Sequence, residues 1–173
     1  MNNSDNTSEA DNGSDAAPLG LRQSLGRFAT GVTVVTCLGS EGPCGITANS
    51  FSSVSLDPPL VLWNIAKVSN SLQAYLDAEY FAINVLSAEQ QPLSAHFALS
   101  DHTLFNGIEF EDSARGVPIL PGTIACFECR THTVHECGDH YIIVGEVETH
   151  RSSGGQPLLF CGGQYLTIAD SAD

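Results

Sequence analysis

The chain has 173 residues, enough for one domain with a sizeable core and too few for a second. Its 20 acidic and 6 basic side chains give a net charge of -14, which disfavours nucleic acid and anionic membranes as partners. No apolar run is long enough to span a bilayer, and no secretory signal opens the sequence. The six cysteines are therefore expected to be reduced thiols in a cytoplasmic protein.

The first 18 residues are polar, acidic and almost free of large apolar side chains. Such a segment buries too little surface to offset its ordering entropy, so we expect a disordered tail over 1–18 and one domain over 19–173. The domain is predicted to begin with a short amphipathic helix that stops near Gly31. The apolar face of this helix comprises Leu21, Leu25, Phe28 and Ala29.

Runs rich in β-branched residues predict six strands further along the chain. These runs are 32–38, 60–65, 81–86, 124–134, 141–148 and 165–168. Helical patterns cover only 69–78 and 88–99, and glycine-containing turns, among them 39–45, separate most strands. Many strands with few short helices predict a mainly β fold, an antiparallel barrel rather than a doubly wound sheet. No GxGxxG follows a strand, which disfavours a Rossmann site.

Small and hydroxyl-bearing side chains fill the segment 45–53, where more apolar bulk would continue a strand. Small side chains let a flat ligand approach the backbone, whose N–H and C=O groups can bond ring heteroatoms. A polar turn or a strand edge is an equally good interpretation of this composition.

The segment 64–71 ends a strand and opens a helix with three capping residues. It contains Lys67, the protein's single lysine. Free N–H groups, hydroxyls and a cation at a helix start form a phosphate site in outline. The alternative is an ordinary N-cap, which needs only one of these residues.

A cysteine- and histidine-rich run over 126–140 resembles a zinc module. In a regular strand, however, Cys126 and Cys129 point to opposite faces, and cysteine is a common core residue. We therefore expect no metal site. His140 follows the turn formed by Gly138 and Asp139, so we expect it at a rim, where these residues alone favour a solvated turn histidine over a functional one.

Taken in order, five segments resemble the flavin reductase-like family with the FMN-binding split-barrel fold. The segments are 28–36, 45–62, 81–87, 138–140 and 144–147. More narrowly, they are similar to the short-chain reductase components of two-component flavin-dependent monooxygenases. The resemblance implies a Greek-key-like antiparallel split barrel that forms a homodimer and reduces FMN or FAD with NADH or NADPH. Reduced flavin would then pass to a partner monooxygenase.

The resemblance also implies a set of site residues. Thr47, Ala48, Asn49 and Ser50 would line the flavin ring and ribityl chain, and His140 would lie near the nicotinamide as the catalytic residue. The ribityl and phosphate end would be approached by Asn64, Lys67, Ser69 and Ser71, and Tyr165 matches an aromatic residue at the same pocket. Two alternatives remain: a pyridoxamine phosphate oxidase-like enzyme of the same fold that acts on another small molecule with tightly bound FMN, and a non-catalytic flavin carrier.

Overall fold

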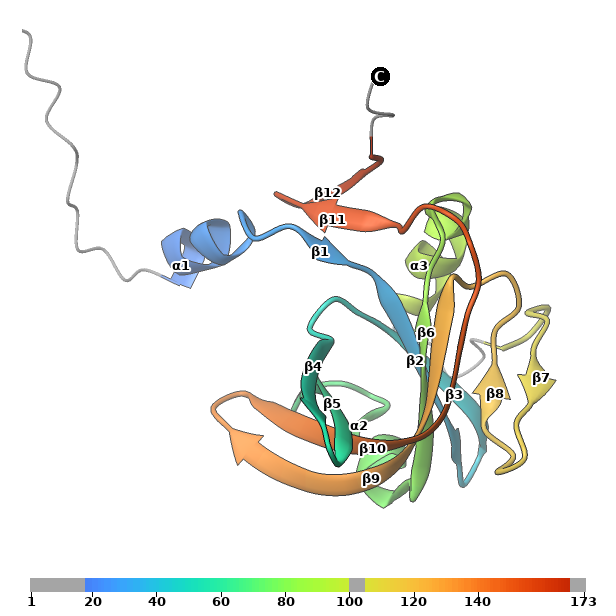
Figure 1. Ribbon diagram of the computed structural model, residues 1–173. Coiled ribbons are helices and arrows are strands. Elements are labelled where there is room, and N and C mark those ends of the chain that lie inside the picture. Colours follow the sequence, from blue (N-terminus) through green and yellow to red (C-terminus); the bar gives the residue numbers. More distant parts are fainter. Residues whose placement is uncertain (1–17, 100–104, 169–173) are drawn as a thin grey trace, which may run out of the picture.

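The computed structural model describes residues 18–99 and 105–168 (Figure 1). The predicted tail therefore lies outside the described residues, except for Pro18, which begins helix α1 (Pro18–Leu25). No helix in the described ranges is both long and apolar enough to cross a membrane.

A seven-stranded antiparallel sheet forms the body of the molecule (Figure 1). In sheet order its strands are β3 (Gly42–Ala48), β2 (Thr33–Gly39), β6 (Tyr80–Val85), β9 (Ala125–Cys137), β10 (His140–Ser152), β5 (Pro59–Ala66) and β4 (Ser52–Leu56). The sheet curls until β3 contacts β5, which encloses a core. The chain crosses from β3 to β4 and returns from β5 to β6, so the order is Greek-key-like, and the predicted antiparallel barrel is confirmed.

The barrel core is built on aromatic residues from three elements. Trp63 of β5 is fully buried and meets the ring of Tyr75 edge-on at 4.9 Å. Tyr75 belongs to α2 (Leu72–Asp77), which packs against β2, and its hydroxyl donates to the Val35 carbonyl at 2.6 Å. Phe81 of β6 completes the group, so α2 is held to the barrel by both packing and a buried hydrogen bond.

A second core lies between the barrel and the remaining small elements. It includes Val34, Leu86 and Phe97, the last from α3 (Gln91–Phe97), which follows the 3-10 turn η1 (Ala88–Gln90). A three-stranded sheet of β1 (Thr30–Gly31), β11 (Leu159–Cys161) and β12 (Gln164–Leu166) contributes to this core. The short hairpin of β7 (Glu111–Asp112) and β8 (Pro118–Ile119) completes the fold.

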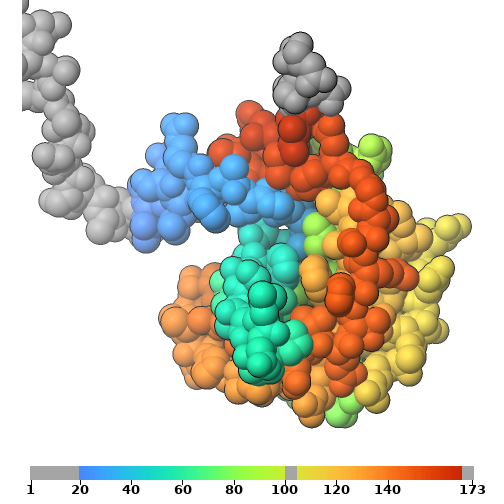
Figure 2. All heavy atoms as spheres, viewed as in Figure 1, coloured from blue at the N-terminus to red at the C-terminus, as the bar shows by residue number. Residues whose placement is uncertain are grey.

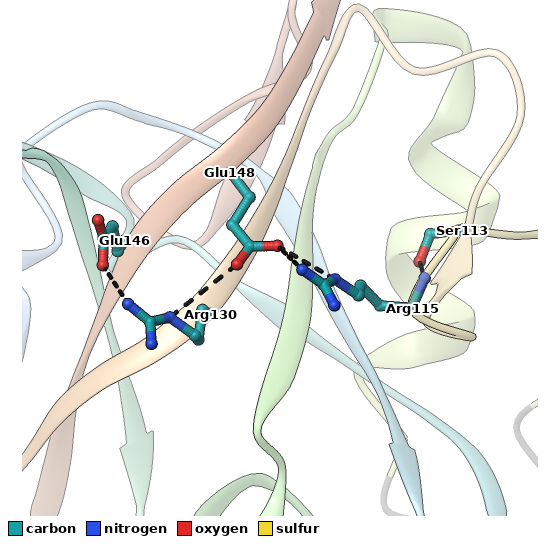
Figure 3. A network of polar contacts seen from close by, with 5 residues as sticks. All are labelled: Ser113, Arg115, Arg130, Glu146 and Glu148. Atoms are coloured by element: carbon teal, nitrogen blue, oxygen red, sulfur yellow. Dashed lines mark hydrogen bonds and ion pairs between the residues drawn. The ribbon is translucent and has the colours of Figure 1, made fainter.

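An ion-pair network joins that hairpin to the barrel (Figure 3). Glu148 of β10 accepts two hydrogen bonds from Arg115, which lies in the turn between β7 and β8. Arg130 of β9 contacts Glu146 at 2.8 Å and approaches Glu148 at 4.0 Å. All four side chains are partly exposed, so we assign the network to positioning the hairpin rather than to a large share of stability.

The predicted strands and helices are present, with three corrections. Residues 39–45 were expected to be a turn, but β2 ends at Gly39 and β3 begins at Gly42, so the turn contains only two residues. The predicted helix over 69–78 is shorter, because 69–71 form turns ahead of α2. The first helix ends at Leu25, and therefore Phe28 and Ala29 lie beyond it.

Among the described residues, the apolar side chains of the first helix and the segment after it are left largely uncovered. Leu21, Leu25 and Phe28 are 57%, 67% and 78% exposed. Helix α1 stands away from the barrel on an arm that leads into β1 (Figures 1 and 2). The packing of the described residues therefore does not account for its amphipathic pattern.

Candidate flavin site

A hollow of about 490 Å³ lies where the end of β3 approaches β5 and β10. Predicted site residues that line it are Thr47, Ala48, Asn49, Ser50, Asn64, Ser69 and His140. These seven residues are separated by up to 93 positions in the sequence, and the fold brings them to one surface. The volume is typical of pockets that bind small organic ligands.

Strand register explains one wall of the hollow. Asn64 pairs with Ile142 and Ala66 pairs with His140 across β5 and β10. Side chains alternate along a strand, so these four residues share one face. Trp63 and Ile65, the two neighbours of Asn64 in β5, belong to the barrel core. This wall of the hollow is thus the outer face of strands whose inner face is the hydrophobic core.

The opposite wall is held by hydroxyl contacts. Thr47 donates to the Ser94 carbonyl of α3 at 2.7 Å, and the Ser50 hydroxyl accepts from the backbone N–H of Asn64 at 2.9 Å. The same Ser50 hydroxyl lies 3.3 Å from the Asn64 carbonyl oxygen, to which it donates. Both hydroxyls therefore fix the segment 47–50 against neighbouring elements.

Asn64 carries an unused polar atom at this surface. Its Oδ1 is buried, yet it has no hydrogen-bond partner among the described residues. A buried acceptor without a donor costs about 1–3 kcal/mol. Such an atom beside a hollow is suited to a ligand that brings an N–H or O–H group.

His140 lies at the rim, as predicted. Strand β9 ends at Cys137 and β10 begins at His140, so Gly138 and Asp139 form a two-residue turn, with Gly138 at φ +60°. His140 Nδ1 is 2.7 Å from Asp139 Oδ1, and this contact lowers the pKa of the Asp139 carboxyl. The carboxylate orients the imidazole and, when Nδ1 carries the proton, leaves Nε2 as the second ring nitrogen available to a ligand.

Three predicted site residues lie apart from this hollow. The Lys67 ammonium contacts Glu136 at 2.6 Å and lies 5.7 Å from the centre of the Tyr141 ring; the carboxylate raises the lysine pKa. Ser71 lines a different hollow beside α2. Tyr165 is connected to the hollow only through Ser94. The hydroxyls of Tyr165 and Ser94 lie 2.9 Å apart, and the Ser94 carbonyl accepts the hydrogen bond from Thr47.

Two of the three cysteines in the run over 126–140 are buried, each in a different core, and Cys137 is exposed. Cys126 packs with Ala82 and Val117, whereas Cys129 belongs to the barrel core, as the alternation of a strand requires. Burial raises the pKa of the Cys126 thiol to about 11 and that of Cys129 to about 12. Within the described ranges, no three His, Cys, Asp or Glu side chains are placed to hold a metal ion.

Comparison with known proteins identifies the family. Residues 25–169 match the model of the flavin reductase like domain. The chain belongs to the flavin reductase-like family. It is 53% identical to FMN reductase (NADH) SmoA of Agrobacterium fabrum, over 84% of this chain and 83% of that protein. It is also 44% identical to the reductase component of a flavin-dependent trigonelline monooxygenase of Acinetobacter baylyi, over 88% of this chain but only 49% of the relative.

Solved structures agree with this family and with the split-barrel fold. The NADH:FAD oxidoreductase SgcE6 of Streptomyces globisporus, in complex with NAD and FAD fragments, superposes with a TM-score of 0.86 at 41% identity. The match covers 91% of this flavin reductase-like chain and 96% of SgcE6. The flavin reductase PheA2 in its native state gives a TM-score of 0.81 at 34% identity, covering 88% of this chain and 98% of PheA2.

The residues of the hollow fit a flavin. Small side chains at 47–50 leave the backbone accessible, and the unpaired Asn64 oxygen can accept from a ring N–H or a ribityl hydroxyl. Sequence reasoning gave no site role to the other lining residues, Ile46, Ile65, Ala66, Cys137 and Ile142. Ala66 and Ile142 could have been found from strand alternation, since they lie two positions from Asn64 and His140.

Proposed function

We propose that this chain is an NADH-dependent flavin reductase that reduces FMN or FAD and supplies the reduced flavin to a partner monooxygenase. The observation that carries the proposal is the hollow between segment 47–50 and the outer face of β5 and β10, in a chain 53% identical to an NADH-dependent FMN reductase. Relatives named as reductase components favour this function over a pyridoxamine phosphate oxidase-like enzyme and over a carrier without turnover.

The bound flavin supplies the hydride-accepting chemistry, and the protein's task is binding and alignment. Thr47, Ala48, Asn49 and Ser50 would hold the flavin ring against the backbone at the end of β3. The unpaired Oδ1 of Asn64 would accept a hydrogen bond from the flavin. His140, held by Asp139 at 2.7 Å, would orient the nicotinamide from the rim. Holding the reacting atoms roughly 3–3.5 Å apart would lower the barrier to hydride transfer without a further catalytic group.

For the phosphate end of the flavin, the geometry favours Ser69 over the rest of the predicted patch. Ser69 lines the hollow, whereas Ser71 faces another one and the Lys67 ammonium is paired with Glu136. Helix α2 has only six residues, and its N-cap residue Ser71 makes no side-chain capping bond. Lys67 could bind the phosphate only if its ammonium released the Glu136 carboxylate.

Replacing Ser69 with alanine should weaken FMN binding by about tenfold, because a hydrogen bond to a charged phosphate contributes roughly 1.5–3 kcal/mol. Riboflavin, which has no phosphate, should bind nearly as well as to the unmodified protein. Ser71→Ala is the matched control and should alter neither ligand. Flavin fluorescence titration measures the affinity of each variant, and of the unmodified protein, for FMN and for riboflavin. Equal weakening of FMN and riboflavin by Ser69→Ala would assign the hydroxyl a structural role.

We also infer a homodimer that works in the cytoplasm. Large apolar side chains are exposed on the arm that carries α1 and just before and after β5 in the sequence. Phe28 is 78%, Leu56 94% and Val68 91% exposed. Such surfaces are typical of a subunit interface. The six cysteines, all described and all free, fit a reducing compartment.

Light scattering on the protein eluting from a sizing column should give a mass twice that of the 18.3 kDa chain. Replacing Leu25 and Phe28 with serine should lower that mass or weaken the association, because both side chains lie on the uncovered arm. A monomeric mass for the unmodified protein at tens of micromolar would contradict the dimer.

A further inference from the structure

Two cysteines face each other across the hairpin of β2 and β3. Cys37 is paired in register with Cys44, and both point to one face, since Cys37 lies in the barrel core and Cys44 packs against that core. The neighbouring pair, Leu38 with Pro43, cannot exchange two backbone hydrogen bonds because proline has no N–H group. Such bonds alternate along an antiparallel ladder, so the cysteines form a hydrogen-bonded pair, whose Cα atoms lie about 5.5 Å apart. This separation is within the range of about 4.4–6.8 Å that disulfides span.

The two thiols are already in contact. The Cys37 thiol is hydrogen-bonded to Cys44, and this bond, together with burial, raises the pKa of Cys37. The Cys44 thiol donates in turn to the Gly42 carbonyl, 3.7 Å away. A Cβ added to Gly39 would lie 3.1 Å from Cys44 Sγ, so the glycine leaves room for the thiol.

One of the two thiols is open to solvent. Cys44 lines the hollow of about 550 Å³ between the hairpin and α2, whereas Cys37 is fully buried. This hollow shares no lining residue with the flavin hollow. Glu41 and Asp77 line it, and none of the described lining residues is basic, which favours a small neutral reagent over an anion. A reagent that enters from solvent therefore meets Cys44 before Cys37.

We propose that Cys37 and Cys44 are an oxidation site, at which hydrogen peroxide converts the two thiols into a disulfide across the hairpin. Cys44 Sγ attacks a peroxide oxygen, the O–O bond breaks, and the leaving oxygen takes the thiol proton, which gives water and a sulfenic acid. Cys37 Sγ then attacks Cys44 Sγ, the S–O bond breaks, and the hydroxyl leaves as water with the Cys37 proton. The thiols lose two electrons and two protons in all, and the peroxide is reduced to two water molecules.

The disulfide should be easily reduced. The Cβ atoms of opposite residues in a sheet lie about 4.5–5.5 Å apart, which exceeds the roughly 3.5–4.5 Å that a disulfide prefers. Strained disulfides have higher reduction potentials and are labile rather than structural. The reaction needs neither flavin nor NADH, so the inference goes beyond the proposed function, and failure of the reductase assignment would not alter its test.

The other cysteines supply internal controls. Cys161 is partly buried but faces Gln164 across its own hairpin. Cys126 and Cys129 lie on opposite faces of β9. Among the described strands, the pair in the β2–β3 hairpin is the one case of two cysteines in register. This pair alone should form a disulfide while the chain stays folded.

Peptide mapping tests the site, because Glu41 lies between the two cysteines in the sequence. The purified protein is treated with hydrogen peroxide until Cys137, an exposed thiol, is oxidised, and the remaining thiols are then alkylated. Cleavage after glutamate separates the fragments that carry Cys37 and Cys44 unless a disulfide joins them. We expect joined fragments that come apart on reduction with dithiothreitol, and we expect Cys161 without a link.

Cys44→Ser should abolish the link, whereas Cys161→Ser should leave its yield unchanged. Cys37→Val should stop the reaction at the sulfenic acid of Cys44, which dimedone labels. If this core variant does not fold, the unmodified protein and Cys44→Ser still decide the result. Fragments that stay unlinked once Cys137 is oxidised would overturn the proposal. Links from Cys161 to either thiol of the pair at a comparable yield would also overturn it, because they require an unfolded chain.

Discussion

Gly145→Val should leave little folded protein under mild denaturing conditions. A Cβ at this position would lie 2.4 Å from Phe81 Cζ and 2.9 Å from Cys129 Cβ, both in the buried barrel core. Overpacking a core with extra methyl groups costs about 1–3 kcal/mol or more. Here the added atoms would meet Phe81, whose ring packs against Trp63 and has little room to move. Since a domain is stable by only about 5–15 kcal/mol, valine should remove a large share of that margin.

Urea unfolding of Gly145→Ala and Gly145→Val measures the loss directly. The matched control is Gly154→Ala, because a Cβ there meets nothing within 4 Å and its φ lies outside the left-handed region. The control should shift the free energy of unfolding by less than about 0.5 kcal/mol. If Gly145→Ala is as stable as Gly154→Ala, the close packing between β10 and β6 described above is wrong.

Two asparagines should respond in opposite ways to replacement by leucine. Asn84 is fully buried; its Nδ2 donates to the Val34 carbonyl at 3.1 Å, and its Oδ1 accepts from the Leu120 N–H at 3.0 Å. Asn84→Leu leaves those backbone groups unpaired, at about 1–3 kcal/mol for each. Asn64 Oδ1 is already unpaired, so Asn64→Leu should leave the unfolding free energy of the flavin-free protein unchanged or higher.

Flavin binding, unlike stability, should be sensitive to the replacement of Asn64. Asn64→Leu should weaken flavin binding by about tenfold, since the acceptor at the hollow is lost while the backbone contacts with Ser50 remain. Urea unfolding without flavin and fluorescence titration with riboflavin give the two quantities. Strong destabilisation by Asn64→Leu without any change in flavin affinity would show that the side chain supports the fold and takes no part in the site.

The sequence was sufficient for the six predicted strands, the barrel and the residues on one wall of the hollow. Segment 45–53 was predicted from its small side chains, and the structure shows a further reason for Gly45: a Cβ there would lie 2.5 Å from the Phe97 ring. That constraint arises between β3 and α3, which are distant in sequence, so local composition could not reveal it. The same holds for β3 itself, whose glycines made it resemble a turn.

The phosphate patch shows where local reasoning fails. Lys67 was assigned to an anion because it stands beside capping residues, but its partner, Glu136, comes 69 positions later and is brought near by the pairing of β10 with β5 and β9.

Steady-state oxidation of NADH by the purified protein, with and without added flavin, tests the central claim most directly. We expect little oxidation without flavin and saturable oxidation with FMN or FAD in the absence of any other organic substrate. The hollow formed by β3, β5 and β10 holds the groups for binding and alignment, so flavin and nicotinamide suffice. Failure to oxidise NADH or NADPH above background at saturating FMN, FAD and riboflavin would contradict the assignment as a flavin reductase.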